Sequence, residues 1–231
     1  MPDLAPLFRK VARHGWRNTL GARALKALDE RCGVRILRGF CIERPDPAFV
    51  KCPAPLKAGF LTAEELRRYA RDPETELSTR FLNNALARGD ECFAIRDADA
   101  LVAYGFYSTG NCPIDAPQLG VSFSEEYVYM YKAFTRPGYR GRRLHAMVKT
   151  QALLRFQALG YKGIVSYVEA TNLDSLKSCL RMGCERFGSV VLLRLHADAF
   201  AFSSPGCQRF NFRLERIGRL ADALRLGETD A

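Results

Sequence analysis

The pattern of hydrophobic and polar residues changes along the chain between a form typical of helices and a form typical of strands. It therefore predicts that helices and strands follow one another. An apolar face that recurs every three to four residues predicts one or two helices over residues 4–31, interrupted at Gly15 and Gly21. Further helices are predicted over 62–70, 78–89, 142–160 and 173–183. Strand-like apolar runs occupy 34–42, 92–95, 101–108, 127–134, 163–169, 189–197 and 208–214.

Local signals support several of these boundaries. Thr62 and Glu65 have the spacing of a capping box, and Asn172 is placed to cap the helix that follows it. The strands 92–95 and 101–108 flank the turn "RDADA" and are therefore predicted to form a hairpin. Strands and helices alternate in the second half of the chain, which favours an α/β fold with a mixed central sheet flanked by helices.

The same pattern divides the chain into three parts. We expect an N-terminal helical extension over residues 1–32 and a main domain over 33–214. A C-terminal helix or tail is expected over 215–231. At 231 residues, of which 48% are hydrophobic, the chain is large enough for the main domain to bury a full core.

Charge narrows the class of partner. Thirty-five Lys and Arg against twenty-five Asp and Glu give a formal net charge of +10. A positively charged chain favours anionic partners. The candidate classes are a phosphorylated cofactor, an acidic carrier protein, nucleic acid and an anionic membrane. We expect no nucleic acid, because the arginines are scattered over many elements and no nucleic-acid-binding motif is present.

The cysteines and the apolar runs indicate in which cellular compartment the protein is expected. Eight cysteines show no CxxC pair and no His/Cys metal spacing, so we expect reduced thiols in the cytoplasm and no metal site. No signal peptide is recognised, and no apolar run approaches the roughly 20 residues that span a bilayer. Peripheral contact with the inner face of a membrane is an alternative, because the basic N-terminal helix carries Trp16.

One basic segment lies between a predicted strand and a predicted helix. "FTRPGYRGRRLHAMV" places Gly141 among Arg140, Arg142 and Arg143, just before the helix begins. Free amides in a first helical turn, together with the helix dipole, bind anions such as pyrophosphate. The alternative is a solvated basic turn that needs glycine for its geometry.

The second half of the chain resembles the GNAT superfamily of acyl-CoA-dependent N-acyltransferases. "TRPGYRGRRLHAMV" is similar to that family's Pro-x-Tyr-Arg-Gly-x-Gly motif, and "VEATNLDSLKSCLRMGCERFG" is similar to its Asn-x-x-(Ala/Ser)-x-x-x-Tyr-x-x-x-Gly-Phe motif. The resemblance covers residues 34–214 and implies a GNAT-like fold with an extra N-terminal helical segment. It also implies a central sheet whose strands part to admit the pantetheine arm of acetyl-CoA or another acyl-CoA.

The resemblance predicts a cofactor site at the basic segment. The residues it implies are Phe134, Thr135, Arg140, Gly141, Arg142, Arg143, Leu144, His145 and Asn172. Two positions that are small in the family hold Arg143 and His145 here, and we interpret this as an adapted phosphate cradle. Three arginines would also suit the acidic surface of an acyl carrier protein.

The second motif departs from the family at a position that commonly protonates the departing thiolate. Asn172, Ser175 and Gly183 match, but Cys179 stands where the family has a tyrosine. A neutral cysteine thiol could act as the acid, since its pKa lies near that of the leaving group. The alternative, which we prefer, is that Cys179 is a small apolar residue packed in the core.

Amine acylation also needs a base and a donor for the developing oxyanion. Glu169 is the first choice for the base, and Glu126 and Glu125 are further candidates, because they bracket the two strands expected to part. The resemblance implies that backbone amides over 131–135 are the oxyanion donors.

We therefore expect an N-acyltransferase that moves an acyl group, acetyl in the first instance, from acyl-CoA to a primary amine by direct attack. The acceptor would be an amine-bearing small molecule or a lipid-linked amine. Two alternatives stay open: a long-chain transferase that uses acyl carrier protein or acyl-CoA, and an inactive GNAT-like module that only binds CoA. Tyr127, Tyr129 and Tyr131 alternate along one strand and form either a pocket wall or ordinary sheet packing.

Overall fold

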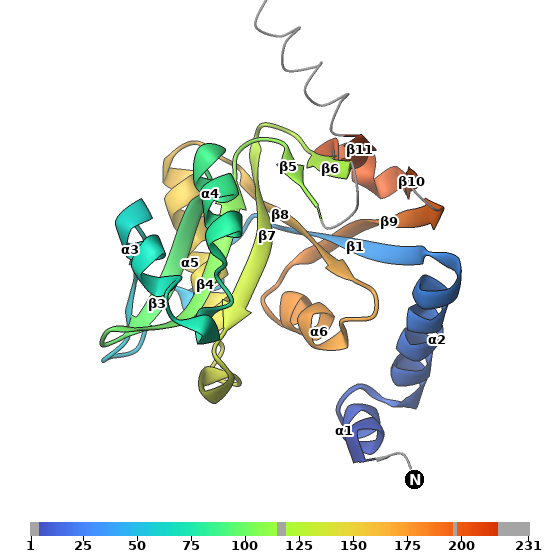
Figure 1. Cartoon of the computed structure of the whole chain (residues 1–231), viewed down its shortest axis with the longest axis horizontal. Helices are drawn as coiled ribbons and strands as arrows, with labels where there is room; N and C mark the ends of the chain where they lie inside the picture. The colour runs from blue at the N-terminus through green and yellow to red at the C-terminus, as the bar shows by residue number, and fades with distance from the viewer. Residues whose placement is uncertain (1–4, 115–118, 196–197, 217–231) are drawn as a thin grey trace, which may run out of the picture. The chain divides into compact units, whose positions relative to one another are not determined.

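The structure is a computed structural model that describes residues 5–114, 119–195 and 198–216. It confirms the predicted α/β fold with helices and a mixed sheet (Figure 1). The chain forms two compact units. The first unit comprises Met1–Phe40, Cys112–Ser122 and Tyr167–Ala231, and the second comprises Cys41–Asn111 and Phe123–Ser166.

The second unit is built on five strands in the order β2-β3-β4-β7-β8. Their bounds are β2 (Lys57–Phe60), β3 (Glu91–Asp97), β4 (Ala100–Ser108), β7 (Tyr127–Thr135) and β8 (Gly163–Glu169), of which the last three residues of β8 fall in the first unit. The first four strands pair antiparallel, and the predicted hairpin is β3–β4. β8 pairs parallel with β7, so the sheet is mixed as predicted.

Helices of the second unit lie on both faces of these strands. One face is covered by α3 (Ala63–Tyr69) and α4 (Thr79–Ala87), whose apolar residues share a buried cluster with Tyr104, Phe106 and Phe134. The other face is covered by α5 (Leu144–Ala158) (Figure 1). Tyr107 packs against this helix, with its ring centroid 5.4 Å from that of Phe156. Short 3-10 turns connect these elements at η1 (Pro47–Phe49), η2 (Pro73–Thr75) and η3 (Pro137–Tyr139).

The first unit contains the N-terminal helices and the last part of the chain. Its elements are α1 (Ala5–His14), α2 (Trp16–Cys32), β1 (Val34–Ile42), β5 (Cys112–Pro113), β6 (Leu119–Ser122), α6 (Leu173–Arg181), β9 (Glu185–Leu195), β10 (Asp198–Ser203), η4 (Pro205–Phe210) and β11 (Arg213–Arg216). The last two residues of β1 fall in the second unit. β1, β9 and β10 are neighbours in that order, and β5, β6 and β11 form a small separate sheet in the order β11-β6-β5.

Most predicted elements are confirmed, and the differences have local causes. The N-terminal helix breaks at Gly15, which has φ 80°, but it continues through Gly21. α5 begins at Leu144 rather than at 142, because Arg143 has left-handed backbone angles and acts as the N-cap.

The prediction for the C-terminal strands was partly wrong. Gln208–Phe210 belong to the 3-10 turn η4, which begins at a proline, and only the last part of the predicted strand forms β11. β10 was not predicted. It pairs antiparallel with β9, and Gly206 lets η4 approach β9 so closely that a Cβ there would lie 1.8 Å from the carbonyl oxygen of Phe187.

The predicted N-terminal helical segment corresponds to α1 and α2, while the domain boundaries at 32 and 214 stay predictions. Residues 217–231 of the predicted C-terminal helix or tail lie outside the described residues. Within the described ranges, no helix combines the length and the apolar character that crossing a membrane requires.

Candidate active site

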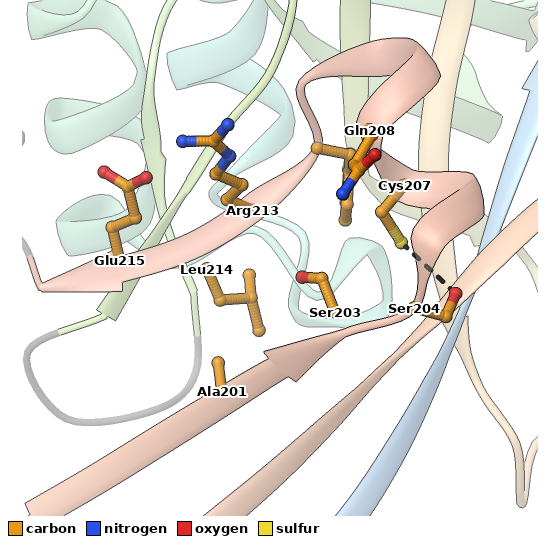
Figure 2. Close-up of a pocket in the computed structure, with 9 residues that line it drawn as sticks. Ala201, Ser203, Ser204, Cys207, Gln208, Arg213, Leu214 and Glu215 are labelled. Atoms are coloured by element: carbon orange, nitrogen blue, oxygen red, sulfur yellow. Dashed lines mark hydrogen bonds between the residues drawn. The ribbon is translucent and has the colours of Figure 1, made fainter.

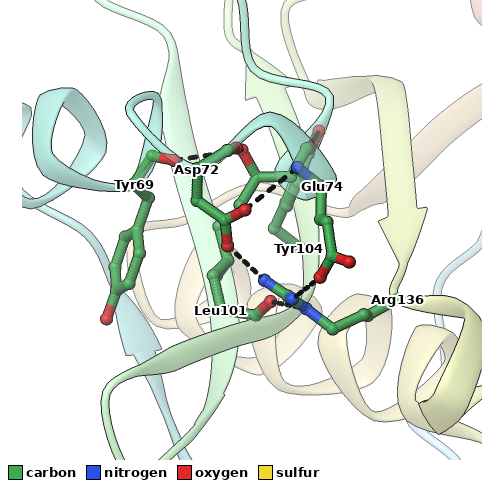
Figure 3. Close-up of polar contacts among 7 residues, drawn as sticks. Tyr69, Asp72, Glu74, Leu101, Tyr104 and Arg136 are labelled. Atoms are coloured by element: carbon green, nitrogen blue, oxygen red, sulfur yellow. Dashed lines mark hydrogen bonds and ion pairs between the residues drawn. The ribbon is translucent and has the colours of Figure 1, made fainter.

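The segment between β7 and α5 is anchored by Arg136. Its guanidinium donates to Asp72 Oδ2 at 2.5 Å, to Glu74, and to the carbonyl oxygen of Leu101 at 3.2 Å (Figure 3). The side chain is 17% exposed, and its charge is balanced by the two carboxylates. Arg136 therefore fixes the start of the turn and is not available for a ligand.

The turn that follows presents a run of free amides. The N–H groups of Gly141, Arg142, Arg143 and Leu144 donate to no acceptor within the described ranges, whereas those of Ala146 and Met147 donate to Arg143 O. Gly141 has φ 84° and Arg143 has φ 60°. Successive free amides in such a turn, at the N-terminus of a 15-residue helix, are an arrangement that can bind an anion.

Arg143 stands at a position where the sequence resemblance predicts a small residue. Its φ of 60° is the left-handed conformation that glycine adopts most easily, so the backbone is turned as a glycine would turn it. The Arg143 side chain is exposed and forms no hydrogen bond or ion pair with the described residues. The substitution thus adds an unpaired cation without changing the direction of the turn.

The other two arginines of the turn are held by local contacts. Arg140 Nε donates to the carbonyl oxygen of Thr135 at 3.2 Å. The Arg142 guanidinium lies 4.9 Å from the ring centroid of Tyr139, whose hydroxyl donates to Asp97 Oδ2 at 2.7 Å. Neither arginine forms an ion pair with a carboxylate in the part of the chain that the structure describes, so both add to the positive field around the free amides.

Two basic residues lie on the buried side of α5. Burial, and then the charge of Lys149, lower the pKa of His145 to about 4, so His145 is neutral at neutral pH. Lys149 is 1% exposed and donates to Ser166 Oγ at 2.9 Å, with no carboxylate partner in the part of the chain that the structure describes. A buried, unbalanced ammonium favours a negatively charged or strongly polar neighbour.

Lys149 reaches β8 at the place where β8 leaves β7. The two strands pair only from Tyr127 with Gly163 to Tyr129 with Val165, and Ser166 is the next residue along. β7 continues to Thr135, paired with β4 alone, and Tyr131 is an extra residue opposite Phe106 and Tyr107. This bulge and the short β7–β8 pairing match the parting strands that the sequence predicts.

A buried cluster beside the bulge was not predicted from the sequence. Asp90 Oδ2 accepts from Arg88 Nη2 at 2.6 Å and from the Tyr131 hydroxyl at 2.9 Å. Asp90 Oδ1 is buried and has no hydrogen-bond partner within the described ranges. Because Asp90 and Tyr131 are 41 residues apart, no local spacing could have revealed this cluster.

The two predicted bases have different surroundings. Glu169 Oε1 accepts from Arg35 Nη1 at 3.0 Å, and Arg35 also bonds Asp29 at 3.0 Å. The second oxygen, Oε2, accepts from the Thr171 hydroxyl at 3.5 Å, and the Glu169 side chain is 42% exposed. Glu126 is exposed at the start of β7 and forms an ion pair with Lys162.

The remaining predicted site residues are also located. Phe134 is buried and stacks on Tyr104, with ring centroids 5.2 Å apart. Asn172 caps α6, as predicted, through Oδ1 accepting from Ser175 N at 3.1 Å. Cys179 is 3% exposed on α6, which suits the packing interpretation. Among the described residues, no group of three or more His, Cys, Asp or Glu is arranged to hold a metal ion.

The chain resembles several solved structures, but its sequence has no match. The sequence matches no protein-family model and no curated protein. A putative GNAT-family acetyltransferase from Novosphingobium aromaticivorans resembles the chain at 18% identity and a TM-score of 0.46, over 68% of this chain and 62% of its own length. A GCN5-related N-acetyltransferase-like protein from Streptococcus suis resembles it at 14% identity and a TM-score of 0.48, over 78% of this chain and 67% of its own.

An aminoglycoside N-acetyltransferase in complex with CoA is also similar, at 13% identity and a TM-score of 0.45, over 59% of this chain and 92% of its own. These neighbours belong to the family whose motifs the sequence resembles. With TM-scores below 0.5 in all three, the likeness says nothing about the substrate, the cofactor or the activity of this chain.

Proposed function

We propose that this protein is an N-acyltransferase that moves an acyl group, acetyl in the first instance, from acyl-CoA to a primary amine. The observation that carries the proposal is the run of four free amides from Gly141 to Leu144 beside Arg140, Arg142 and Arg143. This constellation suits a pyrophosphate, because it combines amide donors, a helix N-terminus and guanidinium groups.

The cofactor would then extend from this turn toward the place where β7 and β8 part. The pyrophosphate would accept from the free amides, and the thioester would lie along β7 near the bulge at Tyr131. Backbone amides over 131–135 would stabilise the oxyanion that forms on the thioester carbonyl. Holding the thioester and the amine together in this way lowers the entropic cost of the reaction.

The transfer itself is a direct attack. The amine nitrogen forms a bond to the thioester carbonyl carbon, the C–S bond breaks, and the thiolate leaves and takes up a proton. Glu169 remains the first choice for the group that accepts the amine's proton, directly or through water, with Glu126 next. Cys179 is the only acid that the motif suggests, and its burial favours a thiolate that is protonated by solvent instead.

The first experiment measures CoA binding by calorimetry. Arg143→Ala is expected to weaken binding by about 1–3 kcal/mol, the range for losing a charge-assisted hydrogen bond. Arg155→Ala is the matched control, because Arg155 is exposed in the last turn of the same helix. Equal CoA affinity in Arg143→Ala and Arg155→Ala, with both folded, would contradict the proposed site.

The second experiment follows thiol release with acetyl-CoA and a panel of primary amines, among them aminoglycosides and lipid-linked amines. Turnover with acetyl-CoA would support acetyl transfer. Turnover only with a long-chain acyl-CoA or an acyl carrier protein would support the long-chain alternative. Glu169→Gln is expected to lower the rate constant of the chemical step and to remove its pH dependence, without a comparable loss of CoA affinity.

A second candidate function is CoA binding without catalysis. It is favoured by the burial of Cys179 at the position of the motif tyrosine and by the ion pair between Glu169 and Arg35. In that case CoA would bind with the Arg143 dependence described above, and no amine would release free thiol from any donor. We propose a cytoplasmic location for either function.

A further inference from the structure

A second basic site lies in the first unit, between the N-terminal helices and α6. A pocket of about 530 Å³ is lined by α1, α2, β1, α6 and β9. None of its lining residues is acidic, whereas Arg17, Arg38 and Arg186 are among them. The pocket shares no residue with the proposed CoA contacts.

Arg38 and Arg186 form an unbalanced pair of like charges. Arg38 Nη1 donates to Ser189 Oγ at 2.7 Å, and Arg186 Nη2 donates to the same oxygen at 3.3 Å. Neither guanidinium has a carboxylate partner among the described residues, and the one hydroxyl cannot neutralise two positive charges. Burial, and then the charge of Arg186, lower the pKa of Arg38. Such a pair destabilises the empty pocket and favours an anion between the two side chains.

Among the other charged residues of this lining, Arg13 is paired with a carboxylate, whereas Lys177 donates to a neutral carbonyl oxygen. Asp174 Oδ1 forms an ion pair with Arg13 Nε at 3.0 Å and lies 3.2 Å from His14 Nε2. Lys177 Nζ donates to the carbonyl oxygen of Arg13 at 3.0 Å. These contacts hold α1 against α6 and thereby close one side of the pocket. Arg38 and Arg186 are thus two guanidinium groups that share one hydroxyl, and Arg17 and Lys177 add further positive charge to the lining.

Apart from His14 and Asn18, the uncharged residues of the lining are apolar or glycine. Leu25 of α2, Phe40 of β1 and Leu176 of α6 lie among the lining residues. A bare phosphate or chloride ion would bond the arginines but would leave this apolar surface in contact with water. An anion that carries a hydrocarbon chain would cover it and gain about 25 cal/mol for each square ångström of apolar surface removed from water. The volume is in the ordinary range for a small-ligand pocket.

A second pocket of the same unit does not have an excess of basic residues in its lining. The cavity of about 390 Å³ between β10, η4 and β11 has Arg213 and Glu215 among its lining residues, and Cys207 lies 3.8 Å from Ser204 Oγ (Figure 2). Its one basic and one acidic residue balance each other. The unbalanced charge is thus a feature of the pocket beside α2 and α6.

We propose that the pocket between α1, α2 and α6 binds an amphiphilic anion. Its carboxylate or phosphate head contacts Arg38 and Arg186, and its single hydrocarbon chain lies against Leu25, Phe40 and Leu176. This site is additional to the proposed acyl transfer, and its test uses no CoA compound.

The test uses the full chain with laurate and with dodecyl phosphate, each below the concentration at which it forms micelles. Calorimetry is expected to show saturable binding of one molecule per chain for at least one of these anions, which also distinguishes a carboxylate head from a phosphate head. Dodecyltrimethylammonium, which has the same chain and the opposite charge, is expected not to bind. Inorganic phosphate is expected to bind at least about tenfold more weakly than dodecyl phosphate.

Variants test the residues. Arg38→Gln and Arg186→Gln are each expected to weaken anion binding about tenfold, as for the loss of a charge-assisted hydrogen bond. Arg186 is exposed, so its replacement leaves the core intact. Arg31→Gln is the matched control, because Arg31 is exposed in the last turn of α2 and does not line the pocket. Ala22→Phe, which narrows the pocket, is expected to weaken the alkyl anions but not inorganic phosphate.

Three outcomes would overturn the proposal. Equal affinity for the alkyl anions in Arg186→Gln and Arg31→Gln would show that Arg186 does not contact the bound anion. Equal affinity of the wild type for inorganic phosphate and dodecyl phosphate would leave only an ion site without a chain. Binding to vesicles of anionic phospholipid with none to the single-chain anions would indicate a membrane-contact surface instead of a pocket.

Discussion

At the scale of single residues, His145 is the group whose protonation the structure predicts most directly. Its pKa is lowered to about 4 by burial and by Lys149, whereas an unfolded chain protonates histidine near 6.5. The unfolded state therefore binds more protons in this interval, and the free energy of unfolding should decrease as the pH falls from about 6.5 to about 4. His145→Asn should reduce this slope in urea denaturation experiments, while above pH 6.5 the contribution is fully present and constant. An NMR titration of His145 in the folded protein with a midpoint near 6.5 would contradict the interpretation.

At the scale of elements, Asn172 caps α6, and a comparison with another helix cap can show whether it also binds the cofactor. Asn172 Oδ1 and Ser78 Oγ each accept from the backbone of the first turn of a helix, α6 and α4 respectively. Asn172→Ala and Ser78→Ala should each lower the free energy of unfolding by about 1 kcal/mol in denaturant titrations. If Asn172 also contacts the cofactor, as the family resemblance predicts, only Asn172→Ala should weaken CoA binding. An equal CoA affinity in the two variants would leave Asn172 as a helix cap alone.

At the scale of the whole molecule, the net charge of +10 should affect both stability and anion binding. Raising NaCl from about 20 mM to about 300 mM shortens the screening length and weakens repulsion among like charges. The thermal midpoint should therefore rise with salt, while the affinity for CoA, a polyanion, should fall. Differential scanning fluorimetry and calorimetry measure the two effects on the same samples. A CoA affinity that does not change with salt would argue against binding at the basic turn.

Local sequence signals accounted for most of the fold. The capping box at Thr62 and Glu65 is formed in both directions, and the Asn172 cap begins its helix as predicted. These features depend on neighbours within three or four residues, so the pattern contains the information that they need. The strand β10 and the turn η4 were missed because their positions depend on close packing against β9, which no local pattern encodes.

In the candidate site, too, some features follow from the local sequence and others from the tertiary structure. By itself, the sequence determined where the basic turn lies, which residues compose it and that a helix follows, since these are properties of a short continuous segment. Only the tertiary structure decided that Arg136 is bound by Asp72 and Glu74, and that the amides from Gly141 to Leu144 stay free. It also decided that Asp90 meets Tyr131 and that Arg38 meets Arg186, because residues far apart in the chain come together only when the strands pair and the core packs.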